Sequence, residues 1–184
     1  MSRAQPSEKS VDSQAGFSPE RRTVLVALGG LVAGACAMGN SAEQNNPSDT
    51  VAARNKANYL AAKAAYNARD LDKCLAHYAP DHQIMSRPTP PGRQHIRSFF
   101  ENTFVTWPDI QLVVENAVAE GDWVMGRSTS TATHSATAMG VPATGKKIQS
   151  SFWDLHRFNK DGLIAQTWNL TDTFSVMQQL GVVP

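Results

Sequence analysis

Apolar residues recur at helical spacing in the first half of the chain. An alanine-rich run from Val51 to Arg69 has high helix propensity, and Tyr59, Ala62 and Tyr66 share one of its faces. Asp70 is placed to cap a second short helix that Pro80 ends, and a proline-rich loop follows from Pro88 to Gly92. From Arg93 to Phe104, four apolar side chains again repeat at helical spacing. The pattern therefore predicts three helices before the strands begin, the third of which turns an aromatic stripe inward.

The second half of the chain changes to strand patterning. Four runs are separated by turn residues, and they are Ile110 to Val118, Trp123 to His134, Lys146 to Phe158 and Leu163 to Thr171. A short helix is expected to begin near Thr173. Helices followed by a meander of strands predict an α+β domain, with the helices packed on one face of an antiparallel sheet.

Strand alternation assigns side chains to faces of that sheet. If residues 159–162 form a four-residue hairpin loop, Asp154 lies opposite Thr167 and diagonal to Asn169. Phe152, Asp154 and His156 then share a face with Thr167 and Asn169. A one-residue slip would invert this assignment.

One strand carries small side chains at alternate positions, ahead of His134. They are Gly126, Ser128, Ser130 and Ala132. Small residues beneath a curved sheet leave volume for a small molecule. The alternative interpretation is that this strand has a solvated polar face.

Length and charge limit the classes of protein that remain. With 184 residues, 41% of them hydrophobic, the chain suits one globular domain. Four of the 17 basic and three of the 16 acidic residues fall within the first 36 positions, so the rest is balanced in charge. Neither nucleic acid nor an anionic lipid surface is expected as a partner.

The N-terminus is typical of a bacterial twin-arginine export signal. Arg21-Arg22 precede a short, glycine-containing apolar run. A signal peptide over residues 1–37, cleaved after Ala37, would leave a linker at 38–50 and a domain at 51–184, exported to the periplasm or the medium. Alternatively, Cys36 is lipidated and anchors the chain, or the segment stays as an uncleaved anchor. Cys74 then remains as a buried structural thiol.

The order of residues in the last third resembles the SnoaL-like polyketide cyclases, also called ester cyclases. The resemblance rests on Gly140-Val141-Pro142, Thr144-Gly145, Asp161-Gly162, Trp168-Asn169 and Gln178 to Gly181, and it extends over roughly Val51 to Pro184. It implies the cone-shaped nuclear transport factor 2-like fold, in which a curved antiparallel sheet and helices enclose one pocket. It also implies chemistry without metal or organic cofactor, and a homodimer through the exposed sheet face, including Trp153, Arg157 and Trp168.

The resemblance also supplies the candidate site residues. The acid that the family carries on its last strand falls on Asn169, and its partner on the preceding strand falls on Asp154. Asp172 matches a further acid of the family, but it is equally placed to cap the C-terminal helix. The catalytic candidates are therefore Asp154, Asn169 and Asp172. The substrate-binding candidates are Phe99, His134, Phe152, His156 and Thr167, and for His134 a backbone-bonding role in a turn is the alternative.

Two functions follow from these observations. The first is an exported SnoaL-like protein whose pocket takes a small apolar, carbonyl-bearing molecule, with acid–base catalysis of the cyclase, isomerase or hydrolase type centred on Asp154. The second is a non-catalytic binding module of the same fold, since an amide cannot exchange a proton as an acid does. The histidines show no zinc-ligand spacing, so no metal is expected.

Overall fold

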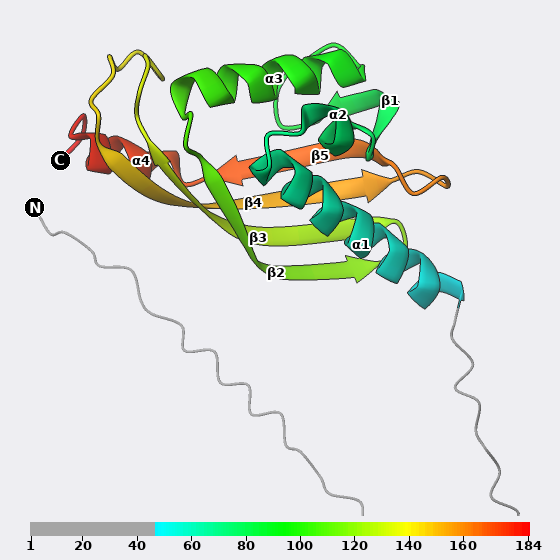
Figure 1. Cartoon of the computed structure of the whole chain (residues 1–184). Coiled ribbons are helices and arrows are strands. Elements are labelled where there is room, and N and C mark those ends of the chain that lie inside the picture. Colours follow the sequence, from blue (N-terminus) through cyan, green and yellow to red (C-terminus); the bar gives the residue numbers. More distant parts are fainter. Residues whose placement is uncertain (1–46) are drawn as a thin grey trace, which may run out of the picture. The chain divides into compact units, whose positions relative to one another are not determined.

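In the described part of the chain, five strands form one sheet in the order β1-β5-β4-β3-β2 (Figure 1). The computed structural model describes residues 47–184. The expected signal peptide, its cleavage site after Ala37 and the lipid site at Cys36 lie outside the described residues. The first helix already begins at Pro47, so residues 47–50, which the sequence assigned to the linker, are helical.

Within residues 47–184, four helices accompany the sheet. They are α1 (Pro47–Asn67), α2 (Leu71–Leu75), α3 (Arg93–Thr106) and α4 (Thr173–Leu180). Asp70 caps α2 as expected, because its side chain accepts a hydrogen bond from the Lys73 amide. Figure 1 shows α1 and α3 lying across the same face of the sheet. None of the helices within residues 47–184 combines the length and apolar character that a membrane crossing requires.

Four of the strands match the predicted runs. They are β2 (Gln111–Glu120), β3 (Trp123–Thr133), β4 (Lys147–Phe158) and β5 (Ile164–Thr171), and consecutive strands of this set pair antiparallel. The α+β class with helices on one face and a short C-terminal helix is confirmed. The sheet is mixed, however, because a fifth strand, β1 (Tyr78–Ile84), runs parallel to β5. The sequence placed Tyr78 on the second helix, and that assignment is wrong.

The β4–β5 connection is one residue longer than predicted. The Asn159 side chain accepts hydrogen bonds from the backbone amides of Asp161 and Leu163, which stabilises a loop over residues 159–163. Phe158 therefore pairs with Ile164, and an irregularity beside it brings Asp154 opposite Asn169 instead of Thr167. From Arg157 back along β4 the register moved by two residues, so Asp154, His156, Thr167 and Asn169 kept their predicted face, whereas Ile164 replaced Leu163 opposite Phe158.

The inner face of the sheet is the buried one. Along β3 and just beyond it, the small residues Ser128, Ser130 and Ala132 and then His134 are all buried. The solvated-face interpretation of this strand is therefore wrong. Aromatic side chains from the helices complete the core, with the Tyr66 ring packed against Phe100 and Phe104. In the described part of the chain no helix covers the outer face, which carries exposed Trp123, Trp153 and Leu170.

Candidate functional site

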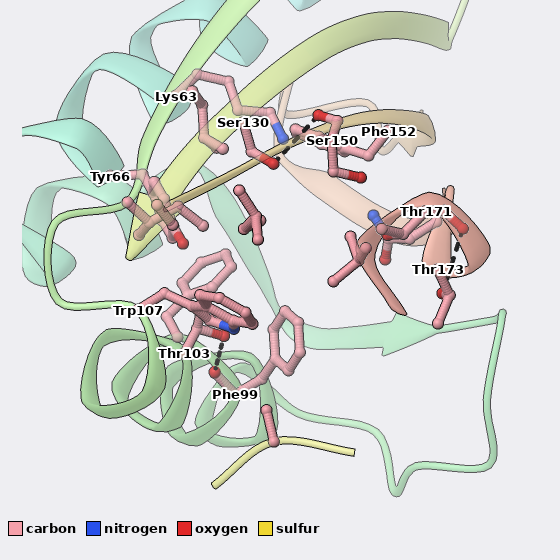
Figure 2. A pocket seen from close by; sticks show the side chains of 18 of the residues that line it. Lys63, Tyr66, Phe99, Thr103, Trp107, Ser130, Ser150, Phe152, Thr171 and Thr173 are labelled. Atoms are coloured by element: carbon pink, nitrogen blue, oxygen red, sulfur yellow. Dashed lines mark hydrogen bonds between the residues drawn. The ribbon is translucent and has the colours of Figure 1, made fainter. Parts of the chain in front are cut away.

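A cavity of about 400 Å³ opens between the helices and the inner face of the sheet. Its size lies within the range of small-molecule sites. Figure 2 shows Lys63, Ser130, Ser150 and Phe152 on one side and Phe99, Thr103 and Trp107 on the opposite side. A polar strip thus runs along the sheet, facing the aromatic stripe of α3.

The chemistry of the wall is one-sided. The described residues that line the cavity include one lysine, one arginine, one asparagine and several hydroxyl side chains, but no aspartate, glutamate or histidine. Lys63 and the Asn169 amide can donate hydrogen bonds to an oxygen of a ligand. None of the carboxylates or imidazoles in residues 47–184 stands on the wall to take a proton from a ligand.

Asp154 lies behind this wall and is fully buried. Its Oδ1 accepts a hydrogen bond from the Tyr59 hydroxyl at 2.9 Å, and its Oδ2 accepts one from the Lys63 ammonium. Nε2 of His156 stands 3.2 Å from Oδ2, although it is not aligned well enough to form a good hydrogen bond. Both carboxylate oxygens are therefore committed to partners within the protein.

The surroundings of Asp154 favour its ionised form. Burial by itself would raise the pKa of this carboxyl group, but the Lys63 charge and the neighbouring His156 outweigh burial and hold the pKa well below its usual value. Burial lowers the pKa of His156, against the opposing effect of Asp154. At neutral pH the arrangement is thus an ionised aspartate between an ammonium and a neutral imidazole.

A chain of hydrogen bonds continues from His156 to the far side of β5. The Thr167 hydroxyl oxygen lies 2.8 Å from Nδ1 of His156 and 2.9 Å from Nε2 of His82. Because ionised Asp154 can only accept, we assign the His156 proton to Nε2. Thr167 then donates to Nδ1 of His156 and accepts from His82, whose own pKa is lowered to about 4 by burial and by His156.

Gly126 of β3 makes the contact between Tyr59 and Asp154 possible. A Cβ atom at this position would stand 1.9 Å from the Tyr59 hydroxyl oxygen and 2.9 Å from Oδ1 of Asp154. Both distances are far below van der Waals contact, so a larger residue would displace one partner. The small residue that the sequence offered as a source of volume is required here for a close approach.

Sequence reasoning missed Lys63, the residue through which this buried network reaches the cavity. Its side chain is 14% exposed, against 0% for that of Asp154. Its Nζ also lies 5.1 Å from the centre of the Tyr59 ring and 5.3 Å from that of Phe152. A usable signal was its position four residues after Tyr59, which places it on the inward face of α1.

Three of the sequence candidates line the cavity, and they are Phe99, Phe152 and Asn169. Asp154, His156 and Thr167 are brought together, but behind the wall. His134 is buried beside Trp107, with ring centres 4.9 Å apart, and its Nδ1 contacts the Thr144 hydroxyl and amide. The turn interpretation of His134 therefore describes it better than a place at the pocket mouth.

Asp172 lies outside the cavity and caps α4. Its side chain accepts a hydrogen bond at 3.0 Å from the Ser175 amide. It is exposed to solvent, as the capping alternative anticipated. Across residues 47–184, no three His, Cys, Asp or Glu side chains are grouped in a way that could hold a metal ion.

Comparison with protein families decides what this arrangement belongs to. The family model of the SnoaL-like polyketide cyclases matches residues 56–180. The chain belongs to the SnoaL-like polyketide cyclase family. Among curated proteins, the search found no match to the chain.

Solved structures agree with the SnoaL-like assignment. AclR of Streptomyces galilaeus, a proposed hydroxylase, is 32% identical, with a TM-score of 0.65 over 72% of this chain and 88% of AclR. IdmH of Streptomyces antibioticus, a proposed polyketide cyclase, is 29% identical, with a TM-score of 0.60 over 70% of this chain and 99% of IdmH. TsrD of Streptomyces laurentii is 25% identical, with a TM-score of 0.66 over 71% of this chain and 97% of TsrD. The nuclear transport factor 2-like fold of these SnoaL-like proteins is thus confirmed for residues 47–184.

Proposed function

We propose that this SnoaL-like protein binds a small, largely apolar, carbonyl-bearing molecule and promotes cofactor-free chemistry of the cyclase or isomerase type by stabilising an enolate. Lys63 and Asn169 would donate hydrogen bonds to the carbonyl oxygen as negative charge develops there. Asp154 would act through Lys63, as the buried anion that orients the ammonium. This moves the catalytic contact from Asp154, where the sequence placed it, to its partner.

One observation supports the proposal above the others. The Lys63–Asp154 ion pair is asymmetric, because the ammonium end reaches the cavity and the carboxylate end is sealed from it. A cation held in an apolar, partly enclosed cavity interacts more strongly with a developing negative charge than it would in water. A proton leaving carbon would pass to water, since the described wall carries no carboxylate or imidazole.

Deuterium exchange tests this chemistry without knowledge of the natural substrate. An aryl methyl ketone such as acetonaphthone is incubated with the protein in deuterium oxide, and label in its methyl group is followed by mass spectrometry. We expect exchange above the buffer rate with the wild-type chain, and loss of that excess in Lys63→Met and Asn169→Leu. Lys56→Met is the matched control, because Lys56 is an exposed lysine on the same helix.

A second candidate is a non-catalytic binding module, favoured by Asn169 standing on the wall where the family resemblance places an acid. Binding of the ketone, seen by calorimetry, without exchange above buffer would establish this function and exclude the enolate chemistry. Absence of binding would exclude both.

We further propose that the chain is exported by the twin-arginine route. The support is the Arg21-Arg22 pair before a short apolar run. Cell fractionation of the full chain should find it in the periplasm or the medium, and Arg21→Lys with Arg22→Lys should retain it in the cytoplasm. Retention of label from a lipid precursor would distinguish anchoring through Cys36 from cleavage after Ala37.

The proposed protein partner is a second copy of the chain. The outer sheet face carries exposed Trp153 and Leu170 beside ion pairs between Arg127 and Glu115 and between Arg157 and Asp122. A two-fold interface brings a patch against itself, and an apolar patch with both signs of charge is compatible with that arrangement.

A further inference from the structure

The charged side chains on the cavity wall are all positive, and the fold alone does not require this. Among the lining residues in the described part of the chain, the two charged ones are Lys63 and Arg87, and both are cations. Every other lining residue is neutral. A wall of this kind discriminates between ligands by their charge as well as by their shape.

Lys63 is the deeper of the two cations. Its Nζ is flanked by the Tyr59 and Phe152 rings, and Asp154 pairs with it from behind. An ammonium has three hydrogen-bond donors, and the one described partner that accepts from it is Oδ2 of Asp154. Donors therefore remain for an oxygen that enters the cavity.

Arg87 stands at the mouth. It is exposed and yet lines the cavity, and its guanidinium lies 4.4 Å above the centre of the Phe99 ring. Stacking on an aromatic ring limits the positions that the guanidinium samples. A negatively charged ligand therefore meets one cation on entry and a second inside.

We infer that the ligand of this cavity is an apolar molecule that carries an anionic oxygen group, such as a carboxylate, which Lys63 binds directly. This rests on the proposed function, because it specifies the ligand of the same cavity. The aromatic stripe of α3 would hold the apolar body, while the anionic group would lie against the polar strip of β3 and β4. A neutral ligand of the same shape would leave the Lys63 donors without an acceptor.

Two fluorescent probes that share one skeleton test the charge requirement. Anilinonaphthalene sulfonate carries an anionic group, and phenylnaphthylamine lacks it. The variant is Lys63→Met combined with Asp154→Asn, which removes both members of the ion pair, leaves the net charge unchanged and avoids an unpaired buried carboxylate. Near-UV circular dichroism checks that the variant is folded.

We expect the double variant to lose about tenfold or more in affinity for the sulfonate, since a charge-assisted hydrogen bond contributes about that much. Its affinity for the neutral probe should stay within about twofold. Arg87→Gln should weaken sulfonate binding by a smaller factor, because exposed charges are screened by salt. Lys56→Met should change neither affinity.

The outcomes separate this inference from the proposed function. If the double variant binds the sulfonate as tightly as the wild-type chain, or loses both probes equally, the inference of an anionic ligand is wrong while the apolar cavity stands. If the wild-type chain binds neither probe, the proposed function fails, and the inference fails with it.

Discussion

Replacing Gly126 by alanine probes the contact on which the orientation of Lys63 depends. The new Cβ would stand 1.9 Å from the hydroxyl oxygen of Tyr59 and 2.5 Å from its Cζ, so the ring must move by about 1.5 Å to reach normal contact. Tyr59 is fully buried and tilts against the His156 ring at 5.4 Å, which leaves it little room.

The cost follows from what the displacement destroys. Losing the hydrogen bond to the charged Asp154 costs about 1.5–3 kcal/mol, and overpacking adds about 1–3 kcal/mol. Alanine also lowers the conformational entropy of the unfolded chain, which offsets about 0.4–1 kcal/mol of this loss in stability. We therefore expect the free energy of unfolding to fall by roughly 3 kcal/mol, which is a large share of the stability of an ordinary domain.

Urea denaturation, followed by tryptophan fluorescence, measures this loss. Tyr59→Phe supplies the control background, because it removes the closest atom and has no hydroxyl bond left to lose. In that background Gly126→Ala should cost less by about 1 kcal/mol or more. A loss below about 0.5 kcal/mol, or the same loss in both backgrounds, would refute the reasoning.

Three further predictions concern the buried network and the outer sheet face. Thr167→Val should lower the free energy of unfolding by about 2–4 kcal/mol, because it leaves ring nitrogens of His82 and His156 without their hydrogen-bond partner. Thr131→Val, at an exposed position, is the control, and equal losses of the two variants in urea denaturation would contradict the assignment. The pKa of His82 is about 4 in the folded chain, against 6.5 for an ordinary histidine, so the unfolded chain binds the proton first as the pH drops. The free energy of unfolding should therefore fall by roughly 3 kcal/mol between pH 6.5 and pH 4. His82→Gln should reduce that slope in urea denaturation at several pH values, and an unchanged slope would sink the explanation. Trp153→Arg should shift the chain from dimer to monomer in sedimentation, and a monomeric wild-type chain would eliminate the proposed interface.

The fold was largely predictable because its strands alternate and its turns are marked. The runs that became β2 to β5 are separated by glycine-containing turns, α1 is rich in alanine, and the apolar residues of α3 recur at helical spacing. Strand β1 escaped prediction because Pro80 and Asp81 interrupt it, and because its partner β5 lies more than 80 positions further along the chain. Parallel pairing over such a separation leaves no local trace in the sequence.

The sequence predicted on which face of the sheet the site residues lie, but not which of them reach the cavity. Alternation placed Asp154, His156, Thr167 and Asn169 on the inner side, as the structure has them. Alternation cannot say which inward side chain reaches a cavity and which is sealed behind another element. Lys63 also escaped because a lysine within an alanine-rich helix is usually exposed, and its aspartate partner lies 91 positions away.

A crystal structure of the full chain with anilinonaphthalene sulfonate bound would show most directly whether the cavity works through Lys63. We expect a sulfonate oxygen within hydrogen-bond distance of Nζ of Lys63, with Asp154 still pairing with the same ammonium from behind. A probe whose sulfonate points to solvent, while Lys63 contacts Asp154 without touching the ligand, would contradict the role given to this lysine.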